Sequence, residues 1–314
     1  MITSGEKFTS MLEVRVPISP TPSFLNRVVL LAKSVRRWYP DTMVTAYVGC
    51  DALETGTRIN GAKALAADDI DVTFHPQGKW VGSRSPYLEQ VNARFEPARA
   101  DHVLICDADV ICTRRFDELF EVDAVQGMQA HMPPYQDADL FRIFVANGLK
   151  PPPFDRMYSG AGIMTGPGNR GPWYVNSGVV FAPARLFDRL CKPYHDAIET
   201  LRKTINDTYW FDQLALMIAV AQSMVPAVSL SQRFNFPNQR EFDPAFPDEL
   251  RDVRFLHYLR TDTIDRDRDF ASEEAMDAFV ARRDLTGSNE VLRRTVDRLR
   301  QPPELSRSED IPWA

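Results

Sequence analysis

The fold is decided by HVLICDADVIC, residues 102–112 of the chain. The run 103–106 is apolar throughout, which is typical of a parallel strand that is buried on both faces. The run meets Asp107 and Asp109 abruptly and then returns to Val110 and Ile111. Ligands of open α/β sheets bind beyond the carboxyl ends of the strands. We therefore expect the two carboxylates to face a ligand-binding crevice.

Strands and helices alternate on both sides of this stretch. One helix is expected to begin at Pro22 and Ser23, because proline is favoured in a first helical turn, and to end at Pro40. The other expected elements are strands at 13–19, 43–48, 71–74, 175–181, 227–230 and 253–258, and helices at 86–98, at 210–222 and within 272–300. This order predicts an α/β protein with a mainly parallel central sheet and helices on both of its faces.

Length and charge limit the classes of function. With 314 residues, the chain is long enough for one large α/β domain or two smaller ones. Its formal net charge of −6 gives it no general attraction for nucleic acid or for anionic membranes. No apolar run approaches the length of about 18 residues that a transmembrane helix needs, and residues 1–14 lack the pattern of a signal peptide. We expect a cytoplasmic protein without a nucleic-acid partner, and the sequence leaves the oligomeric state open.

The chain is expected to change character near residue 270. Residues 127–172 are rich in proline and glycine, which predicts a long excursion with little regular structure. Residues 272–300 are amphipathic and highly charged, which indicates helices. We expect a main domain over 1–270, with a functional loop region at about 127–172, and a C-terminal helical extension over 271–314.

The pattern Asp-x-Asp occurs five times, at 69/71, 107/109, 137/139, 265/267 and 267/269. Only Asp107 and Asp109 directly follow an apolar, strand-like run, whereas 265–269 is expected to be a solvated charge run. Carboxylates are ligands that Mg²⁺ and Mn²⁺ favour, so this pair is a candidate metal site. A simple turn at a strand end is the alternative, since aspartate favours turns.

His257 is the candidate third ligand, because it ends the apolar run 253–258. An imidazole ligand would favour Mn²⁺ over Mg²⁺, which prefers oxygen. The alternative is a hydrogen-bonded core histidine. The remaining histidines have no comparable setting; they are His75, His102, His131 and His195.

Two further groups of polar residues stand beside apolar elements. Asn176-Ser177-Gly178 precedes a strand, and its glycine would let the backbone approach a ligand closely. Asp212-Gln213 opens an apolar helix. Each has an alternative interpretation: a turn into the strand for the first, and an acid favoured by the helix dipole for the second.

In this order, the four elements resemble the GT-A fold glycosyltransferases. The elements are the apolar strand with Asp-Ala-Asp, then Asn-Ser-Gly-Val-Val, then the Asp-Gln that opens a helix, then the strand-end histidine. The closest likeness is to the retaining family 8 type, which includes glycogenin-like proteins and bacterial galactosyl- and glucosyltransferases. It covers roughly residues 13–260 and implies that 1–270 is a catalytic domain that transfers a sugar from a nucleotide-diphosphate sugar to a hydroxyl acceptor.

The resemblance also implies roles for particular residues. Asp107, Asp109 and His257 would bind Mn²⁺ or Mg²⁺, and Asp107 would also lie near the donor ribose. The implied catalytic residues are Asp212, Gln213 and Asn176, and the implied donor-binding residues are Arg94, Asp107, Gly178, Ser19 and Arg260. Asp212 would hydrogen-bond a sugar hydroxyl and Gln213 would lie near the anomeric carbon. In the 127–172 region, Tyr158 and Trp173 are candidates for stacking on the acceptor, with packing as the alternative.

The sequence departs from the family in two places. The loop after the first strand, which is usually acidic and grips the base, is Pro17-Ile18-Ser19-Pro20-Thr21-Pro22 here. The base therefore stays open, with a UDP-sugar favoured and a GDP-sugar possible. The family's Gly-x-x-Lys-Pro-Trp segment after the histidine is replaced by Tyr258-Leu259-Arg260-Thr261, in which Arg260 can substitute for the phosphate-binding lysine.

Two other functions stay open at this point. A nucleotidyltransferase would combine the same fold, metal and nucleotide, but residues 17–22 lack the glycine and the basic residue expected of its loop. A non-catalytic protein that binds nucleotide sugars would keep the pocket without turnover. For a retaining transferase the sequence offers no convincing nucleophile; Asp212 is the nearest candidate, and attack from the face of the leaving group is the alternative.

Overall fold

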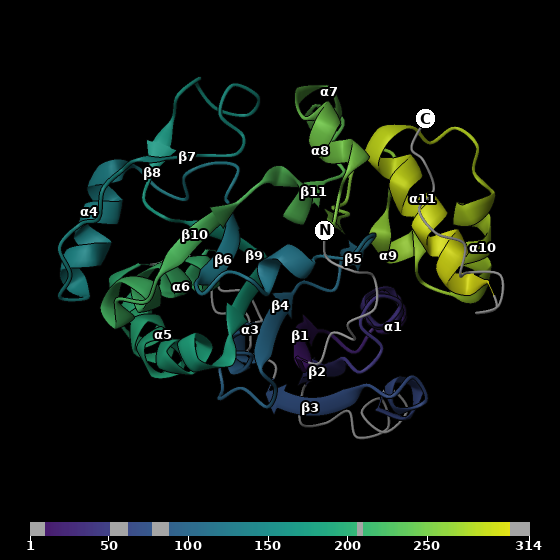
Figure 1. Ribbon diagram of the computed structural model, residues 1–314, viewed down its shortest axis with the longest axis horizontal. Coiled ribbons are helices and arrows are strands. Elements are labelled where there is room, and N and C mark those ends of the chain that lie inside the picture. Colours follow the sequence, from purple (N-terminus) through teal and green to yellow (C-terminus); the bar gives the residue numbers. More distant parts are fainter. Residues whose placement is uncertain (1–9, 51–61, 77–87, 206–209, 302–314) are drawn as a thin grey trace.

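The computed structural model describes residues 10–50, 62–76, 88–205 and 210–301. Its centre is a seven-stranded sheet with the order β10-β6-β9-β4-β1-β2-β3 (Figure 1). The strands are β1 Leu12–Ile18, β2 Met43–Cys50, β3 Asp71–Pro76, β4 His102–Cys106, β6 Val125–Gln129, β9 Val175–Pro183 and β10 Ala227–Leu230. Two small sheets accompany it, one of β11 Phe236–Pro237, β12 Phe255–His257 and β5 Val110–Cys112, the other of β7 Arg156–Met157 and β8 Arg170–Gly171.

The sheet is mainly parallel, as the sequence predicts. β1 pairs in parallel with β2 and β4, β2 with β3, and β6 with β10. β9 is the exception, since it runs antiparallel between β4 and β6. Because both of its neighbours oppose β9, the carboxyl ends of β4 and β6 lie at the same edge of the sheet as the start of β9.

Helices cover both faces of the sheet. They are α1 Pro22–Arg36, α3 Leu88–Ala93, α4 Asp137–Ala146, α5 Ala184–Thr204, α6 Phe211–Ser223, α7 Phe242–Ala245, α8 Pro247–Arg251, α9 Arg266–Asp269, α10 Glu273–Ala281 and α11 Gly287–Arg300. α1 begins as expected, with Pro22 in its first turn and the backbone N–H of Phe24 donating to the N-cap hydroxyl of Thr21.

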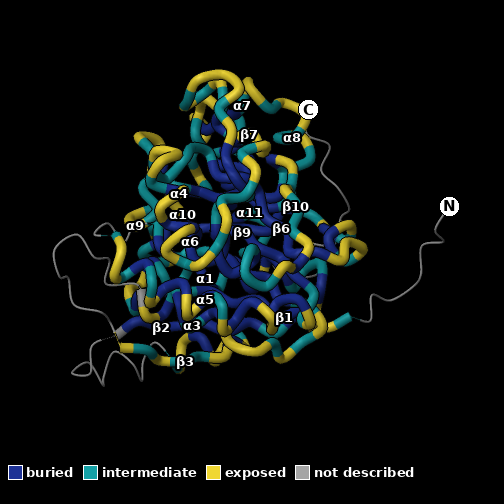
Figure 2. Tube along the Cα trace, turned by 90° about the vertical axis from the view of Figure 1, so that its left-hand side faces the viewer, coloured by how far each residue is buried: buried dark blue, intermediate teal, exposed yellow. Residues whose placement is uncertain are grey.

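The two faces of β4 explain its continuous apolar run. Leu104 and Cys106 join the hydrophobic core on the side of α1, whereas Val103 and Ile105 join the core that includes α5 and α6. All four side chains are completely buried, and the central strands form the buried interior in Figure 2. Burial on both faces leaves only the strand ends available for polar chemistry.

The expectation of little regular structure over 127–172 is wrong in part. β6 reaches residue 129, and α4 forms within this region. Leu140, Ile143 and Phe144 are buried at helical spacing on one side of α4, and acids occupy its first turn, where the helix dipole favours them. The proline and glycine content masked this short amphipathic helix.

Other element boundaries also differ from the sequence prediction. Of the helix expected at 86–98, α3 covers 88–93, and residues 86 and 87 lie outside the described part. The helix ends there because Pro97 disfavours a helical conformation of the residue before it. α5, the longest helix of the described residues, was not expected from the sequence, in which Pro193 interrupts its pattern.

The expected C-terminal helices are present as α10 and α11, which lie beside α1 (Figure 1). They share a third hydrophobic core with β12 and α7, in which Leu256, Phe279 and Leu292 are buried together. The described part of the extension therefore packs against the strand that carries His257, and the domain boundary at 270 remains a prediction. Within the described ranges, no helix is long and apolar enough to cross a membrane.

Candidate active site

Two strand pairings bring the predicted metal ligands together. Asp107 follows β4, and its backbone N–H donates to the carbonyl of Gly178 at 3.0 Å, which extends the pairing with β9 by one residue. Asp109 immediately precedes β5, which pairs antiparallel with β12 so that Val110 lies opposite His257. The backbone N–H of Tyr258 donates to the carbonyl of Asp109 at 2.8 Å. Residues about 150 positions apart thus become direct neighbours.

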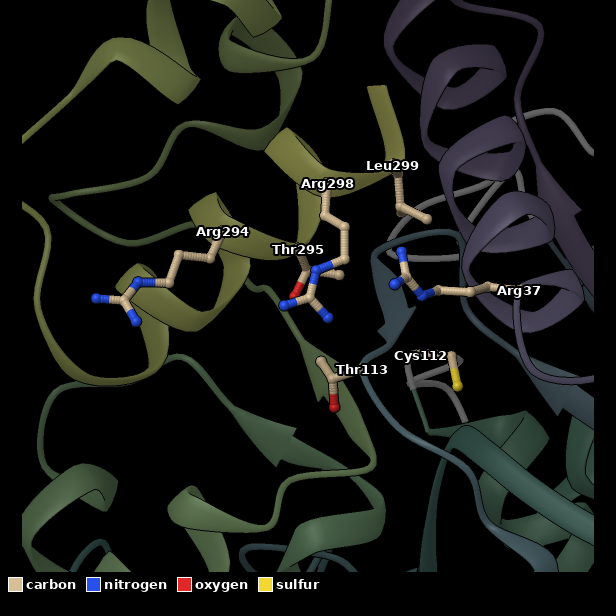
Figure 3. Close-up of a pocket in the computed structure, with 7 residues that line it drawn as sticks. All are labelled: Arg37, Cys112, Thr113, Arg294, Thr295, Arg298 and Leu299. Atoms are coloured by element: carbon tan, nitrogen blue, oxygen red, sulfur yellow. The ribbon is translucent and has the colours of Figure 1, made fainter. Parts of the chain in front are cut away.

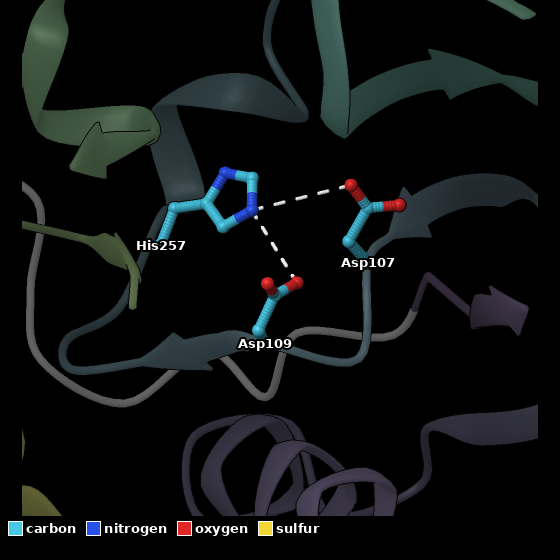
Figure 4. A group of neighbouring side chains, drawn as sticks. All are labelled: Asp107, Asp109 and His257. Carbon is cyan, nitrogen blue, oxygen red and sulfur yellow. Dashed lines mark ion pairs between the residues drawn. The ribbon is translucent and has the colours of Figure 1, made fainter. Parts of the chain in front are cut away.

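The three side chains point toward one another (Figure 4). His257 Nε2 lies 3.3 Å from Asp109 Oδ1 and 4.0 Å from Asp107 Oδ2. One ligand atom from each residue lies within 4.8 Å of the other two, and Asp109 and His257 are buried. The structure confirms the predicted grouping of these three residues, and within the described residues it is the one such cluster.

The chemistry of this cluster fits a divalent cation. Burial lowers the pKa of His257 from 6.5, against the opposing effect of Asp107, so the imidazole is neutral at pH 7. Its Nδ1 faces the carbonyl oxygen of Asn235 at 3.0 Å and therefore carries the hydrogen. Nε2 then presents a lone pair to the two carboxylates. Three acceptors that face one another require a positive charge between them, and two carboxylates with one neutral imidazole suit Mn²⁺ or Mg²⁺.

Arg266 supplies part of the positive charge around this cluster. It belongs to α9 in the run 265–269, and its guanidinium forms an ion pair with Oδ2 of Asp109. The interpretation of this run as a solvated charge run is therefore wrong for Arg266, which is only 30 % exposed. Sequence spacing gave no signal for this contact, because it depends on how α9 packs against α1, where Ser23 donates to the Arg266 carbonyl at 2.8 Å.

Arg94 connects the metal cluster to the start of α6. Its guanidinium lies 3.5 Å from Asp107 Oδ1 and 3.7 Å from Asp212 Oδ2, and its side chain is completely buried. Asp212 also accepts a hydrogen bond from the hydroxyl of Ser177. The structure thus gives Arg94 the role of positioning two carboxylates, and direct contact with a donor remains a prediction.

Gly178 lies directly against the imidazole of His257. A Cβ at this position would lie 2.6 Å from Cε1 of His257 and 2.7 Å from Oδ1 of Asn176. The missing side chain therefore makes room for this imidazole, and the expected contact of Gly178 with a donor remains a prediction. The Gly178 N–H donates to Asn176 Oδ1 at 2.8 Å, which orients the Asn176 amide.

The remaining predicted donor residues lie around the same edge. Gln213 is buried in the first turn of α6, and among the described residues its Oε1 has no hydrogen-bond partner. Ser19 directly follows β1 at the carboxyl edge, and its buried hydroxyl likewise lacks a partner within the described part of the chain. Arg260 is 59 % exposed and forms ion pairs with Asp265 and Asp267. Its predicted contact with phosphate would require it to exchange these carboxylates for the ligand.

Of the two acceptor candidates, Tyr158 lies in the hydrophobic core and Trp173 is partly buried against it. Tyr158 is only 2 % exposed and belongs to the core that includes α5 and α6, and Trp173 packs against the same core. A buried ring has no free face for a sugar, so the stacking role is wrong for Tyr158. The alternative of packing is confirmed for it.

His131 interacts electrostatically with His257 and was not among the site residues predicted from the sequence. It follows β6, whose carboxyl end lies at the same edge as that of β4, and Nδ1 lies 2.8 Å from the Ser159 hydroxyl. Burial first, and then the charge of His257, lowers its pKa to about 4. A polar residue just after an apolar strand was the available signal, as it was for Asp107. Assigning 127–172 to a loop concealed it.

Two hollows of the surface lie apart from this cluster. Between α1 and α11, Arg37 and Arg298 reach toward Thr113 around a cavity of about 20 Å³, which holds about one water molecule (Figure 3). Burial, and then the like charge of Arg298, lowers the pKa of Arg37. A larger cavity of about 450 Å³ lies along α4 and the end of α5, where Asp139 and Arg142 help to line it. Neither hollow is lined by a residue of the metal cluster.

Comparisons with known proteins support the fold. No protein-family model and no curated sequence matches the chain. An active-site mutant of LgtC has 15% sequence identity and a TM-score of 0.50, covering 94% of this chain and 99% of that one. The galactosyltransferase LgtC in complex with donor and acceptor sugar analogues has 16% identity, a TM-score of 0.49 and the same coverage. Mouse xyloside xylosyltransferase 1 has 14% identity and a TM-score of 0.44, covering 79% of this chain and 97% of that one.

The chain therefore has the GT-A fold of nucleotide-sugar glycosyltransferases, as the order of its motifs predicted.

Proposed function

We propose that the protein is a metal-dependent glycosyltransferase that moves a sugar from a nucleotide-diphosphate donor to a hydroxyl of a carbohydrate or other acceptor. The observation that supports it most is the convergence of Asp107, Asp109 and the lone pair of His257 Nε2 at the carboxyl edge of a GT-A sheet. Mn²⁺ or Mg²⁺ bound there would neutralise the charge of the departing diphosphate. A UDP-sugar is the favoured donor, and a GDP-sugar is the alternative.

The protein's own groups would orient the donor sugar beside this charge. Asn176 accepts two hydrogen bonds at Oδ1, so its Nδ2 is left to donate to a sugar hydroxyl. Asp212 would accept a hydrogen bond from another hydroxyl, with Arg94 and Ser177 holding the carboxylate in place. Gln213, whose buried Oε1 lacks a protein partner, would lie near the anomeric carbon.

For a transfer that retains the anomeric configuration, the surroundings of Asp212 favour attack by the acceptor from the face of the leaving group over attack by Asp212 itself. A carboxylate whose Oδ2 accepts from Ser177 and pairs with Arg94 is held by these partners, which makes it a poor nucleophile. In the proposed step the acceptor oxygen bonds to the anomeric carbon, the bond to the diphosphate oxygen breaks, and that oxygen takes the acceptor's proton. The transition state would have oxocarbenium character, as in other glycosyl transfers.

Thermal unfolding tests the donor site first. UDP, GDP, dTDP, CDP and ADP are each added with and without Mn²⁺ to wild type, Asp109→Asn and the control Asp139→Asn. A ligand that binds only the native state raises the melting temperature. We expect one diphosphate to stabilise wild type and the control only when Mn²⁺ is present, and to leave Asp109→Asn unchanged. No stabilisation of wild type by any diphosphate would contradict the proposal.

Turnover separates the transferase from its alternatives. The nucleotide that binds is supplied as a set of nucleotide sugars, and the release of nucleoside diphosphate is followed with simple sugars as acceptors. NMR of the product then gives the anomeric configuration. Binding without release would favour a non-catalytic nucleotide-sugar-binding protein, and release of pyrophosphate from a nucleoside triphosphate with a sugar phosphate would favour a nucleotidyltransferase. The cytoplasmic location expected from the sequence remains a prediction.

A further inference from the structure

A chain of three hydrogen bonds connects the backbone to the metal-facing histidine. The N–H of Gly178 donates to Asn176 Oδ1 at 2.8 Å, and Asn235 Nδ2 donates to the same oxygen at 2.9 Å. Asn235 Oδ1 in turn lies 3.0 Å from His257 Nδ1. Asn235 is 1 % exposed, so water does not compete for either end of its amide.

The direction of every bond in this chain follows from its first donor. A backbone N–H can only donate, so the Asn176 atom that faces Gly178 must be the carbonyl oxygen. The Asn235 atom that faces this oxygen must then be the NH₂ group. The other end of Asn235, its carbonyl oxygen, therefore faces His257, and Nδ1 must carry the imidazole hydrogen. One backbone group thus determines the tautomer of a side chain 79 positions away, at the distances that the structure gives.

We propose that Asn235 is a positioning residue, which holds His257 with its Nε2 lone pair toward Asp107 and Asp109 and ties this orientation to the amide of Asn176. The inference rests on the metal site of the proposed function. A flipped Asn235 amide would place an NH₂ group against Nδ1 and an oxygen against the Asn176 oxygen, so two bonds would be lost together. His257 would then favour the hydrogen on Nε2, where it would block ligation.

The chain of hydrogen bonds from Gly178 to His257 also has a consequence for the donor sugar. Because Asn176 Oδ1 is occupied by Gly178 and Asn235, the half-buried Asn176 offers a ligand only its Nδ2 hydrogens. A sugar hydroxyl at this place must accept the hydrogen bond. The same two amides therefore orient a metal ligand and determine that the sugar hydroxyl accepts the hydrogen bond and does not donate it.

Neighbouring bonds leave the ring little freedom to find another arrangement. The backbone of β12 pairs with β5 on one side and with β11 on the other, and Asn238 N donates to the His257 carbonyl at 3.2 Å. Gly178 lies against the ring, where even a Cβ would be 2.6 Å from Cε1. With backbone and ring face both held, the tautomer depends on the groups that face the two ring nitrogens, the Asn235 amide at Nδ1 and the carboxylates of Asp107 and Asp109 at Nε2.

The tautomer can be measured in the wild-type protein without activity or metal. Long-range ¹H–¹⁵N correlation spectra of protein labelled on histidine nitrogen distinguish the two tautomers, and His257→Gln assigns the signal. We expect the hydrogen on Nδ1. A hydrogen on Nε2 in place of Nδ1 would overturn the chain of bonds.

Binding of Mn²⁺ alone, followed by the EPR signal of the free ion, tests the positioning role. Loss of a group that orients a metal ligand typically weakens metal binding 10- to 100-fold, which we expect for Asn235→Leu. Asn235→Asp keeps an oxygen facing Nδ1 but places its other oxygen against Asn176 Oδ1, so its affinity should lie between those of wild type and Asn235→Leu. Asn147→Leu, which changes an asparagine at the end of α4, is the matched control.

The link through Asn176 has its own variant. Asn176→Ala removes the oxygen that orients Asn235. Although Asn176 is not a metal ligand, this variant should weaken Mn²⁺ binding, by a smaller factor than Asn235→Leu does.

Unchanged Mn²⁺ affinity in Asn235→Leu would overturn the positioning role, and unchanged affinity in Asn176→Ala would overturn the link. Wild type that binds no Mn²⁺ would instead overturn the metal site of the proposed function. If Asn235→Leu does not fold, the wild-type spectrum and Asn235→Asp still decide the proposal.

Discussion

The tripeptide Asp-Ala-Asp occurs twice in this chain, at 107–109 and at 137–139, in two different physical settings. The first copy joins β4 to β5, where His257 from β12 lies 3.3 Å from Asp109. The second opens α4, where both acids occupy the first turn and Asp139 pairs with Arg142 at 2.8 Å. Among the residues that the structure describes, the first copy alone lies beside a third potential metal ligand.

The two copies differ in whether potential metal ligands converge on them, and this convergence is the reason for proposing the site at the first copy. The second copy lies beside the larger cavity, of about 450 Å³, yet its carboxylates are engaged in the ordinary tasks of a helix start. At the first copy, strand pairing fixes three acceptor atoms within 4.8 Å of one another. Each prediction below tests this contrast.

The largest effect is expected when one carboxylate of the first copy is neutralised. Asp109→Asn keeps the shape of the side chain and removes a ligand charge from a buried site, so kcat should fall on the order of 10²–10³-fold. Mn²⁺ affinity, measured by EPR, should fall with it. If Asp109→Asn bound Mn²⁺ as tightly as wild type does, the proposed difference in metal binding between the two copies would be lost.

His131, which interacts electrostatically with His257 beside the first copy, predicts the pH dependence of stability. His131 has its pKa lowered to about 4, chiefly by burial. As pH falls from 6.5 to 4, the unfolded state gains a proton at this residue that the native state does not bind, so stability falls with pH. The contribution of His131 to the free energy of unfolding that is lost in full amounts to about 3 kcal/mol.

Urea unfolding of wild type and His131→Gln at pH 7 and pH 4 measures this effect. The variant should lose less stability between the two pH values than wild type does. Because the two proteins share all other titrating groups, this difference reports on His131. The same acid loss in both proteins would show that His131 is protonated in the native state, and that its neighbourhood is less buried than the packing against Phe242 indicates.

Gly178→Ala changes the surroundings of the first copy without replacing a proposed metal ligand. The added Cβ would lie 2.6 Å from the His257 ring, so the ring or the β9 backbone has to move. We expect Mn²⁺ affinity to fall about 10- to 100-fold, as for other groups that orient a ligand. Gly166→Ala is the control, because a Cβ there has nothing within 4 Å. Equal affinities in the two variants would mean that the imidazole does not need its present position.

The sequence predicted the first copy well because its signals are local. An apolar run buried on both faces, followed at once by carboxylates, places Asp107 and Asp109 at the carboxyl edge without any knowledge of the rest of the fold. The parallel sheet follows from the same alternation of short strands and helices. His257 was found by similar reasoning, since it also ends an apolar run.

The sequence did not reveal contacts that depend on packing between distant elements. Arg266 reaches Asp109 through the position of α9 against α1, and Asn235 reaches His257 from a turn with no pattern of its own. α4 was hidden because proline and glycine on either side outweighed ten residues of amphipathic spacing. Tyr158 was a candidate for stacking on the acceptor, with packing as the alternative, because burial in a long connection leaves no periodic signal.

The smallest effect is expected at the second copy, and it is the one that most directly tests the comparison. Asp139→Asn removes an acid that is 43 % exposed from the first turn of α4, together with its pair to Arg142. Such pairs and dipole contacts contribute about 0.3–1 kcal/mol, which a shift in urea midpoint can resolve. Mn²⁺ affinity should stay within error of wild type, because no third ligand lies beside this copy within the described residues. Loss of metal-dependent nucleotide binding in Asp139→Asn would identify the large cavity along α4 as the donor site and reverse the roles of the two copies.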